Sequence, residues 1–258
     1  MNTLFSSLAL VAAMVSAGAA LAAPVKPTVV LVHGAFADSS SWNGVVKILQ
    51  KDGYPVIAAS NPLRSLKGDA KSVADVLASI KTPVVLVGHS YGGPVISAAA
   101  YGNANVKALV FVAAIAPDTG ESTAELSGRF PGGTLGPTLA APVVLADGAK
   151  DLYIQQDKFH DQFAADVSNA DAQVMAATQR PVTAAALNEA SSEPAWNTVP
   201  SWFVYGDADK NIPAQAQAFM AERAHAKQTV VVKGASHVVM VSNPNVVASL
   251  IEKAAEAE

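Results

Sequence analysis

A serine stands between glycines at the end of an apolar run in the stretch VVLVGHSYGG, residues 84–93. Gly88 and Gly92 lie two residues before and two residues after Ser90. Where a G-x-S-x-G pattern joins a strand to a helix, it forms a sharp, strained turn that presents the serine hydroxyl at the edge of a sheet. The Tyr91 amide then faces the place where negative charge develops on a reacting carbonyl. The alternative is an ordinary glycine-rich turn without chemistry.

A serine nucleophile depends on a base and on an acid that orients the base. In this kind of turn the chain order is serine, then acid, then histidine. Among the five histidines, only His237 has this order and follows a predicted strand, in the run VVVKGASHVVM. Asp207 and Asp209 both lie in the loop after the preceding strand, in the run WFVYGDADKNIP, and their spacing alone leaves both open as partners of His237.

The sequence predicts other roles for the four remaining histidines. His33 and His89 abut the ends of predicted strands and are expected to hydrogen-bond neighbouring loops. His160 is a candidate to face the pocket, because it lies in a long segment between two core strands. His225 closes a predicted helix among charged residues and is expected on the surface, near the negative end of the helix.

A second amide for a developing oxyanion is expected in the loop after the first strand. That loop carries the run HGAF, residues 33–36. The Ala35 N–H is the first candidate and the Phe36 N–H the second. The alternative is that Gly34 only permits the turn.

Apolar runs of strand length alternate with segments of helical spacing along the chain. The strands are expected at residues 28–32, 55–59, 84–87, 107–114, 201–205 and 229–232, and the helices at 42–51, 69–80, 91–101, 213–225 and 245–256. This alternation predicts a parallel sheet of about six strands with helices on both faces. Right-handed crossovers then place the strand ends that carry the candidate residues at one edge.

The alternation is interrupted between residues 117 and 196, which begin with a stretch rich in glycine, proline and serine. A hairpin is expected around residues 142–154, and short helices near 158–167 and 170–179. A segment this long between core strands is expected to form a lid or a second domain. The predicted organisation is a signal peptide over 1–22, core segments over 23–116 and 197–258, and a lid over 117–196.

The composition excludes several classes of function. The chain has 258 residues, 51% of them hydrophobic, which suits one large domain with a sizeable core. Its net charge is −4 and no block of Lys and Arg occurs, so nucleic-acid binding is not expected. The absence of cysteine excludes disulfides, thiolate metal sites and a cysteine nucleophile.

The first 22 residues have the pattern of an export signal. They contain no charged side chain, and the apolar run ends in Ala20-Leu21-Ala22, an A-x-A type of cleavage site. Cleavage after Ala22 would place the protein in the periplasm or outside the cell, without stable membrane association. The missing basic residue near Met1 leaves an uncleaved anchor as the alternative.

Four runs together resemble the α/β-hydrolase superfamily: VLVHGAF, GHSYGG, GDADKNIP and GASHVVMVSNP. They are most similar to its small-lidded branch of plant methyl esterases, hydroxynitrile lyases and pyrethroid-type esterases, over essentially the whole mature chain. In that branch the acid stands directly before a K-x-I-P-like turn. The resemblance therefore implies Asp209 as the acid, beside His237 as base and the Ala35 and Tyr91 amides as oxyanion donors. It also implies an α/β-hydrolase fold with a small inserted lid.

Two positions narrow the chemistry that the resemblance implies. Val238 stands where some hydroxynitrile lyases have a lysine for cyanide, which disfavours that lyase reaction. Ser90 stands where dehalogenases and epoxide hydrolases have a nucleophilic aspartate, which disfavours an aspartyl-ester route.

The sequence thus predicts a serine esterase that cleaves a small or medium carboxylic ester, with no metal or cofactor. Phe36 is expected to contact the substrate. The pocket lining is expected from the apolar residues of the insertion, although many of these are expected to form the insertion's own core. They are Phe130, Leu135, Leu139, Tyr153, Phe159, Phe163 and Met175, with Trp42 from the core. An acyltransferase or a cofactor-free perhydrolase would use the same triad, and a ligand-binding protein on this scaffold is a third hypothesis.

Overall fold

A computed structural model describes residues 25–257, so the predicted signal peptide lies outside the described residues. Its main sheet has six strands in the order β2-β1-β3-β4-β8-β9, and all neighbouring pairs are parallel. The strands are β1 (Thr28–Val32), β2 (Val56–Ala59), β3 (Val84–His89), β4 (Val106–Val112), β8 (Ser201–Gly206) and β9 (Gln228–Val232). The predicted six-stranded α/β fold is confirmed.

The central strands form because their side chains are apolar on both faces. Every residue of β1 and β3 is buried, as expected for parallel strands covered by helices on both sides. The register pairs Val30 with Leu86 and Val87 with Val110. This register carries the ends of β1, β3 and β4 to the same edge of the sheet, where the turn at Ser90 begins.

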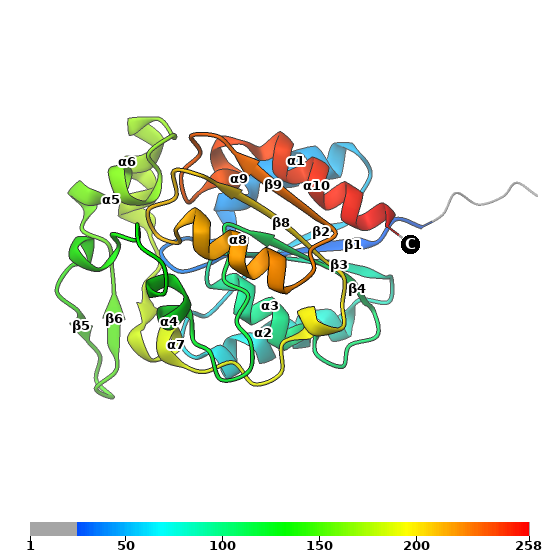
Figure 1. The fold of residues 1–258 in the computed structure, drawn as a ribbon, viewed down its shortest axis with the longest axis horizontal. Coiled ribbons are helices and arrows are strands. Elements are labelled where there is room, and N and C mark those ends of the chain that lie inside the picture. Colours follow the sequence, from blue (N-terminus) through cyan, green and yellow to red (C-terminus); the bar gives the residue numbers. More distant parts are fainter. Residues whose placement is uncertain (1–24, 258) are drawn as a thin grey trace, which may run out of the picture.

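Helices cover both faces of the sheet (Figure 1). On one face, α1 (Asn43–Lys51) packs against α10 (Pro244–Glu256), with the short α9 (Val239–Ser242) beside them. On the other face, α2 (Leu66–Ser79) packs against α3 (Gly92–Ala100), and α8 (Ala214–Arg223) packs against β8. A 3-10 turn, η1 (Ser39–Trp42), precedes α1.

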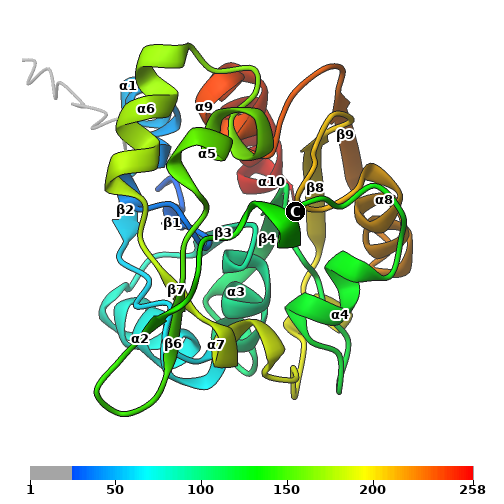
Figure 2. The ribbon, with the colours of Figure 1, turned by 90° about the vertical axis from the view of Figure 1, so that its left-hand side faces the viewer.

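The segment between β4 and β8 forms a separate layer of short elements, which Figure 2 shows in front of the sheet. A small antiparallel sheet has the strand order β5-β6-β7. The elements are α4 (Thr123–Gly128), η2 (Gly136–Thr138), β5 (Val143–Val144), β6 (Lys150–Leu152), α5 (Gln156–Phe163), α6 (Asn169–Thr178), β7 (Val182–Thr183), α7 (Ala184–Asn188) and η3 (Ala195–Asn197). We call residues 117–196 the insertion. The domain limits drawn from the sequence stay a prediction.

Three local expectations differ from the structure. The helix expected from residue 69 begins at Leu66, because the Ser65 side chain accepts a hydrogen bond from the Gly68 amide and caps it. The expected hairpin is present as β5 and β6, but a third strand, β7, joins it. Helices α4 and α7 were not expected, and a capping box of Ser122 and Glu125 starts α4.

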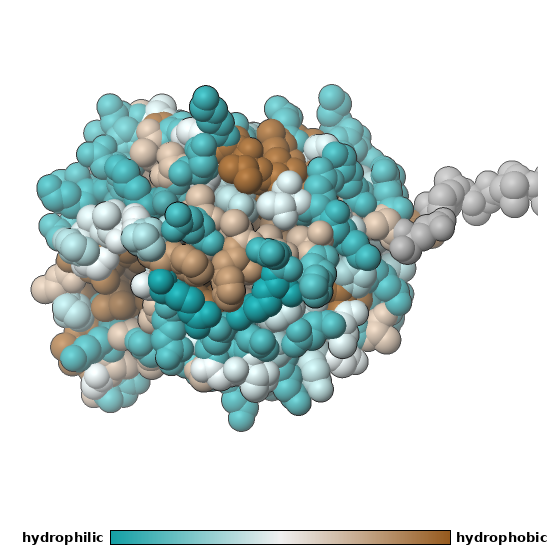
Figure 3. Space-filling view, viewed as in Figure 1, coloured by the Kyte–Doolittle hydropathy of each residue, from teal (hydrophilic) through white to brown (hydrophobic). Residues whose placement is uncertain are grey.

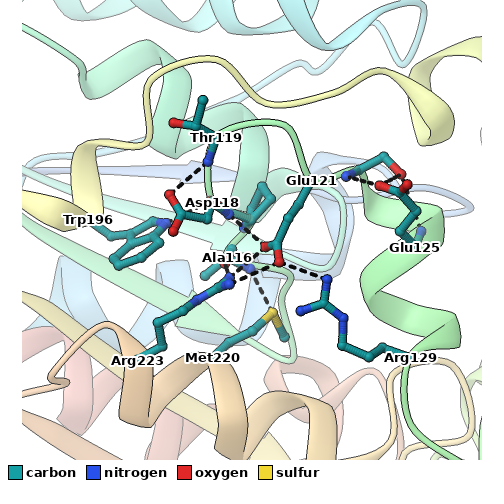
Figure 4. Close-up of polar contacts among 11 residues, drawn as sticks. Ala116, Asp118, Thr119, Glu121, Glu125, Arg129, Trp196, Met220 and Arg223 are labelled. Atoms are coloured by element: carbon teal, nitrogen blue, oxygen red, sulfur yellow. Dashed lines mark hydrogen bonds and ion pairs between the residues drawn. The ribbon is translucent and has the colours of Figure 1, made fainter.

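The two ends of the insertion are bonded to each other at its base. The Gly120 amide donates to the Ser191 carbonyl at 2.8 Å, and the Ser191 amide donates to the Glu121 carbonyl at 2.8 Å. Beside this base, the Glu121 carboxylate pairs with Arg223 of α8 and with Arg129, both at 2.8 Å (Figure 4). The insertion therefore leaves and re-enters the core at one fixed place.

Arg64 and Glu189 join the insertion to the core at the start of α2. Arg64 lies just before this helix, and its guanidinium donates to Asp151 of β6 at 2.6 Å and to the Pro181 carbonyl at 2.7 Å. The Glu189 carboxylate accepts hydrogen bonds from the Leu66 and Lys67 amides, which lack partners inside the helix. A carboxylate at this end also interacts favourably with the helix dipole. The insertion is thus bonded to the core on both sides of the sheet edge.

The surface has few large apolar side chains. Figure 3 shows an apolar patch near β9 and α10. None of the helices between residues 25 and 257 has both the length and the apolar character needed to cross a bilayer.

The Glu121 cluster makes the stability of the fold sensitive to acid. Burial alone would raise the pKa of the Glu121 carboxyl, but hydrogen bonds from Arg223, from the Asp118 amide and from Arg129 outweigh it and lower the pKa to about 2. Because this value lies below the ordinary 4.5, the carboxylate stabilises the fold above about pH 4.5. That contribution is lost as the pH falls from 4.5 toward 2.

We therefore expect Glu121→Gln to lower the free energy of unfolding at pH 7 by about 2 kcal/mol and to flatten its decrease between pH 4.5 and 2. Urea unfolding at several pH values measures both effects. Asp75→Asn is the control, because its pair with Lys71 is solvent-exposed and contributes under about 1 kcal/mol. Equal pH profiles for wild type and Glu121→Gln would contradict the assignment.

Candidate active site

The chain turns sharply at Ser90, between β3 and α3. Its φ is 52°, in the left-handed region that side chains other than glycine rarely adopt. A Cβ on Gly88 would lie 2.6 Å from the Gly92 carbonyl oxygen, and one on Gly92 would lie 2.6 Å from that of Val32. Both positions therefore require glycine, which is the physical reason for the G-x-S-x-G spacing. The strained turn predicted from the sequence is present.

The backbone on either side holds this turn in place. The Ser90 amide donates to the Val112 carbonyl at 3.3 Å, and the Ser90 carbonyl accepts from the Gly93 and Ile115 amides at 2.9 and 3.2 Å. The end of β4 therefore supports the turn, and strain of this kind persists only where neighbours fix it.

The structure brings the predicted acid and base together. His237 Nδ1 lies 2.8 Å from Asp209 Oδ2, and both side chains are almost fully buried. Because a carboxylate only accepts, His237 carries its proton on Nδ1 and presents the lone pair of Nε2. That tautomer is the one a general base requires.

The Asp209 carboxylate is fully engaged by its own loop. Its Oδ1 accepts hydrogen bonds from the Asn211 and Ile212 amides at 2.8 and 3.0 Å. Its Oδ2 accepts from Gln217 Nε2 at 3.0 Å in addition to His237. Asp207 instead accepts from the Gly234 amide at 2.5 Å and is exposed. Of the two acids, the structure pairs Asp209 with His237 and gives Asp207 a role in bracing the loop.

Ser90 and His237 line one pocket, at the edge of the sheet beneath the insertion. Within residues 25–257, no hydrogen bond to another protein group occupies Ser90 Oγ or His237 Nε2. Both atoms are thus free to act on a bound molecule. Hydrogen bonds between catalytic groups often tighten only when the substrate binds.

The expected oxyanion donors line the same pocket. Neither the Ala35 nor the Tyr91 amide is engaged by a backbone carbonyl in the described part of the chain. Tyr91 is the N-cap residue of α3, so its N–H lies at the positive end of that helix. The alternative donor, the Phe36 N–H, is wrong, because it donates to the Arg180 carbonyl at 3.1 Å.

A second histidine, His89, packs directly behind His237. Its Nε2 donates to the His237 carbonyl at 3.1 Å, and the ring centroids lie 4.8 Å apart. Burial, and next the charge of a protonated His237, hold the pKa of His89 well below its ordinary value. His89 therefore stays neutral and braces the histidine loop without adding a competing charge.

The three other histidines, His33, His160 and His225, do not line the pocket. His33 Nδ1 donates to the Gly34 carbonyl and Nε2 accepts from the Asn61 amide, both at 3.0 Å. Burial lowers the pKa of His33. His160 donates to the Val167 carbonyl at 2.9 Å and does not line the pocket, so that candidate is wrong. His225 is exposed after α8 with a φ of 48°.

The side chain of Tyr91 has a role that sequence reasoning missed. Its hydroxyl donates to Asp69 Oδ2 at 2.9 Å, in the buried interior beneath the turn at Ser90. Burial raises the pKa of Asp69, and burial together with the Asp69 charge raises the pKa of Tyr91. This buried pair fastens the residue that follows the nucleophile to α2. No sequence spacing points to it.

The pocket is small and mostly apolar, with a volume of about 260 Å³. Phe36, Leu135, Leu139 and Phe163 line it as expected. Phe130, Tyr153, Phe159, Met175 and Trp42 do not. Phe130 packs on Phe219 and Phe159 on Phe163, whereas Trp42 packs against His89 and Met175 borders a neighbouring cavity.

The insertion also bonds to the loops that carry the acid and the base. Gln162 of α5 donates to the Lys210 carbonyl at 3.0 Å and to Asn211 Oδ1 at 2.7 Å. Ser236, next to His237, donates to the Asp166 carboxylate. These contacts were not expected, because they depend on how the insertion folds back over the core.

With this geometry established, comparison with known proteins identifies the family. The sequence model of the alpha/beta hydrolase family matches residues 29–250. The chain belongs to the alpha/beta hydrolase family. The superfamily that the four sequence runs resemble is thereby confirmed, and family membership supports a hydrolase.

Individual relatives of this hydrolase agree with that assignment. The chain is 27% identical to the alpha/beta hydrolase nvfD of Aspergillus novofumigatus, over 90% of this chain and 97% of that protein. Its fold is similar to that of polyneuridine aldehyde esterase, with a TM-score of 0.76 at 21% identity, over 88% of this chain and 98% of the other. It is also similar to a pyrethroid hydrolase from Sphingobium faniae JZ-2, with a TM-score of 0.71 at 20% identity, over 90% and 98%.

The two loop acids provide a matched test of this site. We expect Asp209→Asn to lower the kcat of hydrolysis by about 10³- to 10⁴-fold, because an amide no longer fixes the His237 tautomer. Asp207→Asn changes the exposed acid of the same loop, which contacts only the loop backbone, and we expect it to lower kcat by less than about tenfold. Steady-state kinetics on one ester measures both variants. A larger loss in Asp207→Asn would reverse the assignment.

Proposed function

We propose that this protein is a serine esterase that cleaves a neutral carboxylic ester through an acyl-enzyme. The observation that carries the proposal is the buried Asp209–His237 pair, which faces the pocket beside Ser90. The names of two structures with a similar fold, an aldehyde esterase and a pyrethroid hydrolase, support it.

In the first half-reaction, His237 Nε2 takes the Ser90 proton as Oγ attacks the ester carbonyl carbon. The carbonyl oxygen becomes an oxyanion that accepts hydrogen bonds from the Ala35 and Tyr91 amides. The protonated imidazole is stabilised by Asp209 and returns the proton to the departing alkoxide, which leaves as an alcohol. The acyl group remains on Ser90.

In the second half-reaction, water takes the place of the alcohol. His237 removes a proton from the water, whose oxygen attacks the acyl carbonyl carbon. Collapse of the second oxyanion breaks the bond to Ser90 Oγ, which recovers its proton from His237. The products are a carboxylic acid and an alcohol, and every atom comes from the ester and one water.

The lining of the pocket supports a small, neutral substrate. No Lys, Arg, Asp or Glu is among its lining residues, so a charged substrate group would lose its hydration without compensation. Its walls are mainly apolar side chains, including Phe36 and Leu139. A compact apolar acyl or alkyl group suits a volume of about 260 Å³.

The experiment that tests this function is hydrolysis of p-nitrophenyl esters of increasing acyl length by wild type and Ser90→Ala. We expect Ser90→Ala to lower kcat by at least about 10⁴-fold at every length, because the nucleophile is lost. The rate should fall once the acyl chain exceeds the pocket. Product analysis with added alcohol or peroxide shows whether water is the preferred acceptor. Full activity in Ser90→Ala would exclude this mechanism.

A further inference from the structure

The loop after β1 carries one of the two expected oxyanion donors, the Ala35 N–H, and hydrogen bonds hold its successive peptide groups. Asn61 Nδ2 donates to the His33 carbonyl at 3.0 Å. His33 Nδ1 donates to the next carbonyl, that of Gly34, also at 3.0 Å. The His33 and Asn61 side chains are both fully buried. Two buried polar side chains are therefore used to fix the backbone directly before the donor.

The neighbours of His33 also fix its tautomer. The Asn61 backbone amide only donates, so the ring atom 3.0 Å from it, Nε2, must accept. The Gly34 carbonyl only accepts, so Nδ1 must carry the proton. Burial lowers the pKa of His33, which keeps the ring neutral and able to accept on one nitrogen while it donates from the other. Both ends of the ring thus require the same tautomer.

Holding the Gly34 carbonyl also sets the direction of the Ala35 N–H. The two groups belong to one peptide unit, which is planar and trans, so the carbonyl and the N–H point in opposite directions. The hydrogen bond from His33 Nδ1 therefore fixes the donor from its far side. His33 has this effect although its side chain does not line the pocket.

The order of the strands indicates where that N–H points. β1 lies between β2 and β3 in the sheet. Asn61, which bonds to the imidazole of His33, follows β2, so the ring and the Gly34 carbonyl lie on the β2 side of the loop. The Ala35 N–H points the other way, toward β3 and the nucleophile turn. A Cβ on Gly34 would lie 3.1 Å from the Tyr91 nitrogen, so this peptide lies directly against that turn.

We propose that His33 is a positioning residue, whose hydrogen bond to the Gly34 carbonyl aims the Ala35 N–H at the oxyanion that forms on the substrate. His33 acts through the backbone and does not contact the substrate. This inference rests on the proposed function, because the oxyanion forms only if Ser90 attacks a carbonyl. Removing a whole oxyanion donor costs an enzyme about 10²- to 10³-fold in kcat, so a donor that is aimed wrongly costs part of that factor.

Two amide variants of His33 separate the two hydrogen bonds of its ring. In His33→Asn, the side-chain amide stands in the place of Nδ1, so it still donates to the Gly34 carbonyl but does not reach the Asn61 amide. In His33→Gln, the longer side chain carries its amide to the place of Nε2, so it still accepts from Asn61 but does not donate to Gly34. Each variant keeps one bond and loses the other.

The measurements are kcat/KM for p-nitrophenyl butanoate and Ki for propyl trifluoromethyl ketone, which has the same acyl chain. Ser90 Oγ adds to the carbonyl carbon of the ketone and His237 takes the hydroxyl proton. The ketone oxygen becomes an alkoxide in the place of the oxyanion. Such a compound resembles the transition state and binds through the same donors. A partly unfolded sample lowers the apparent kcat but leaves Ki unchanged, so Ki reports on the oxyanion site itself.

We expect His33→Gln to lower kcat/KM by about 10- to 100-fold and to raise Ki by a similar factor, because the Ala35 N–H loses its orientation. The conservative variant His33→Asn should restore both values to within about threefold of wild type. Equal effects in the two variants would overturn the inference. A Ki in His33→Gln equal to that of wild type would overturn it as well.

A measurement on wild type separates this inference from the proposed function and does not depend on the folding of a variant. ¹H–¹⁵N NMR of the histidine rings should show the His33 proton on Nδ1 at pH 7, and a proton on Nε2 would overturn the inference. If wild type neither hydrolyses esters nor binds the ketone, the proposed function fails and the tautomer still decides whether His33 holds the Gly34 carbonyl. If esters are hydrolysed but the proton is on Nε2, only the inference fails.

Discussion

The left-handed backbone at Ser90 is the constraint on which the rest of the site depends. It exists because β3 must turn into α3 within a few residues, and it fits only because glycines at positions 88 and 92 let the chain segments approach closely. Hydrogen bonds to the end of β4 hold the turn, and the buried Tyr91–Asp69 pair fastens it from below. The strained turn brings the Ser90 hydroxyl and the Tyr91 amide, at the start of α3, to the same part of the pocket.

Asp209 and His237 lie on separate loops, after β8 and after β9, and the insertion is bonded to both loops. Gln162 bonds to the loop after β8, and Asp166 bonds to Ser236 in the loop after β9. The insertion itself is fastened at its base by the pair of Glu121 with Arg223 of α8, and at the loop before α2 by the pair of Asp151 with Arg64. A change far from the pocket, at either anchor, can therefore alter the spacing of the catalytic groups. The insertion covers the site and also positions it.

Much of the core could be predicted from the sequence, because buried strands such as β1 and β3 are runs of Val and Leu and a G-x-S-x-G pattern directly after such a strand indicates a nucleophile turn. The insertion was predicted less well. Helix α4 and strand β7 are too short for their periodicity to show, although Ser122 and Glu125 mark the start of α4. Sequence spacing placed Asp207 and Asp209 in one loop but said nothing of their side-chain directions. The donor choice between Ala35 and Phe36 depended on the Arg180 carbonyl, a contact that only the folded chain reveals.

The central claim is that Ser90 forms a covalent bond to the acyl group during turnover. The most direct measurement is mass spectrometry of the intact protein, with peptide mapping, after acid quenching of wild type in the middle of ester turnover. The account predicts a mass increase equal to one acyl group, on the peptide that contains Ser90, and none in Ser90→Ala. Rapid turnover with an adduct on another residue would contradict the account. Rapid turnover with an early burst of alcohol release but no adduct would also contradict it.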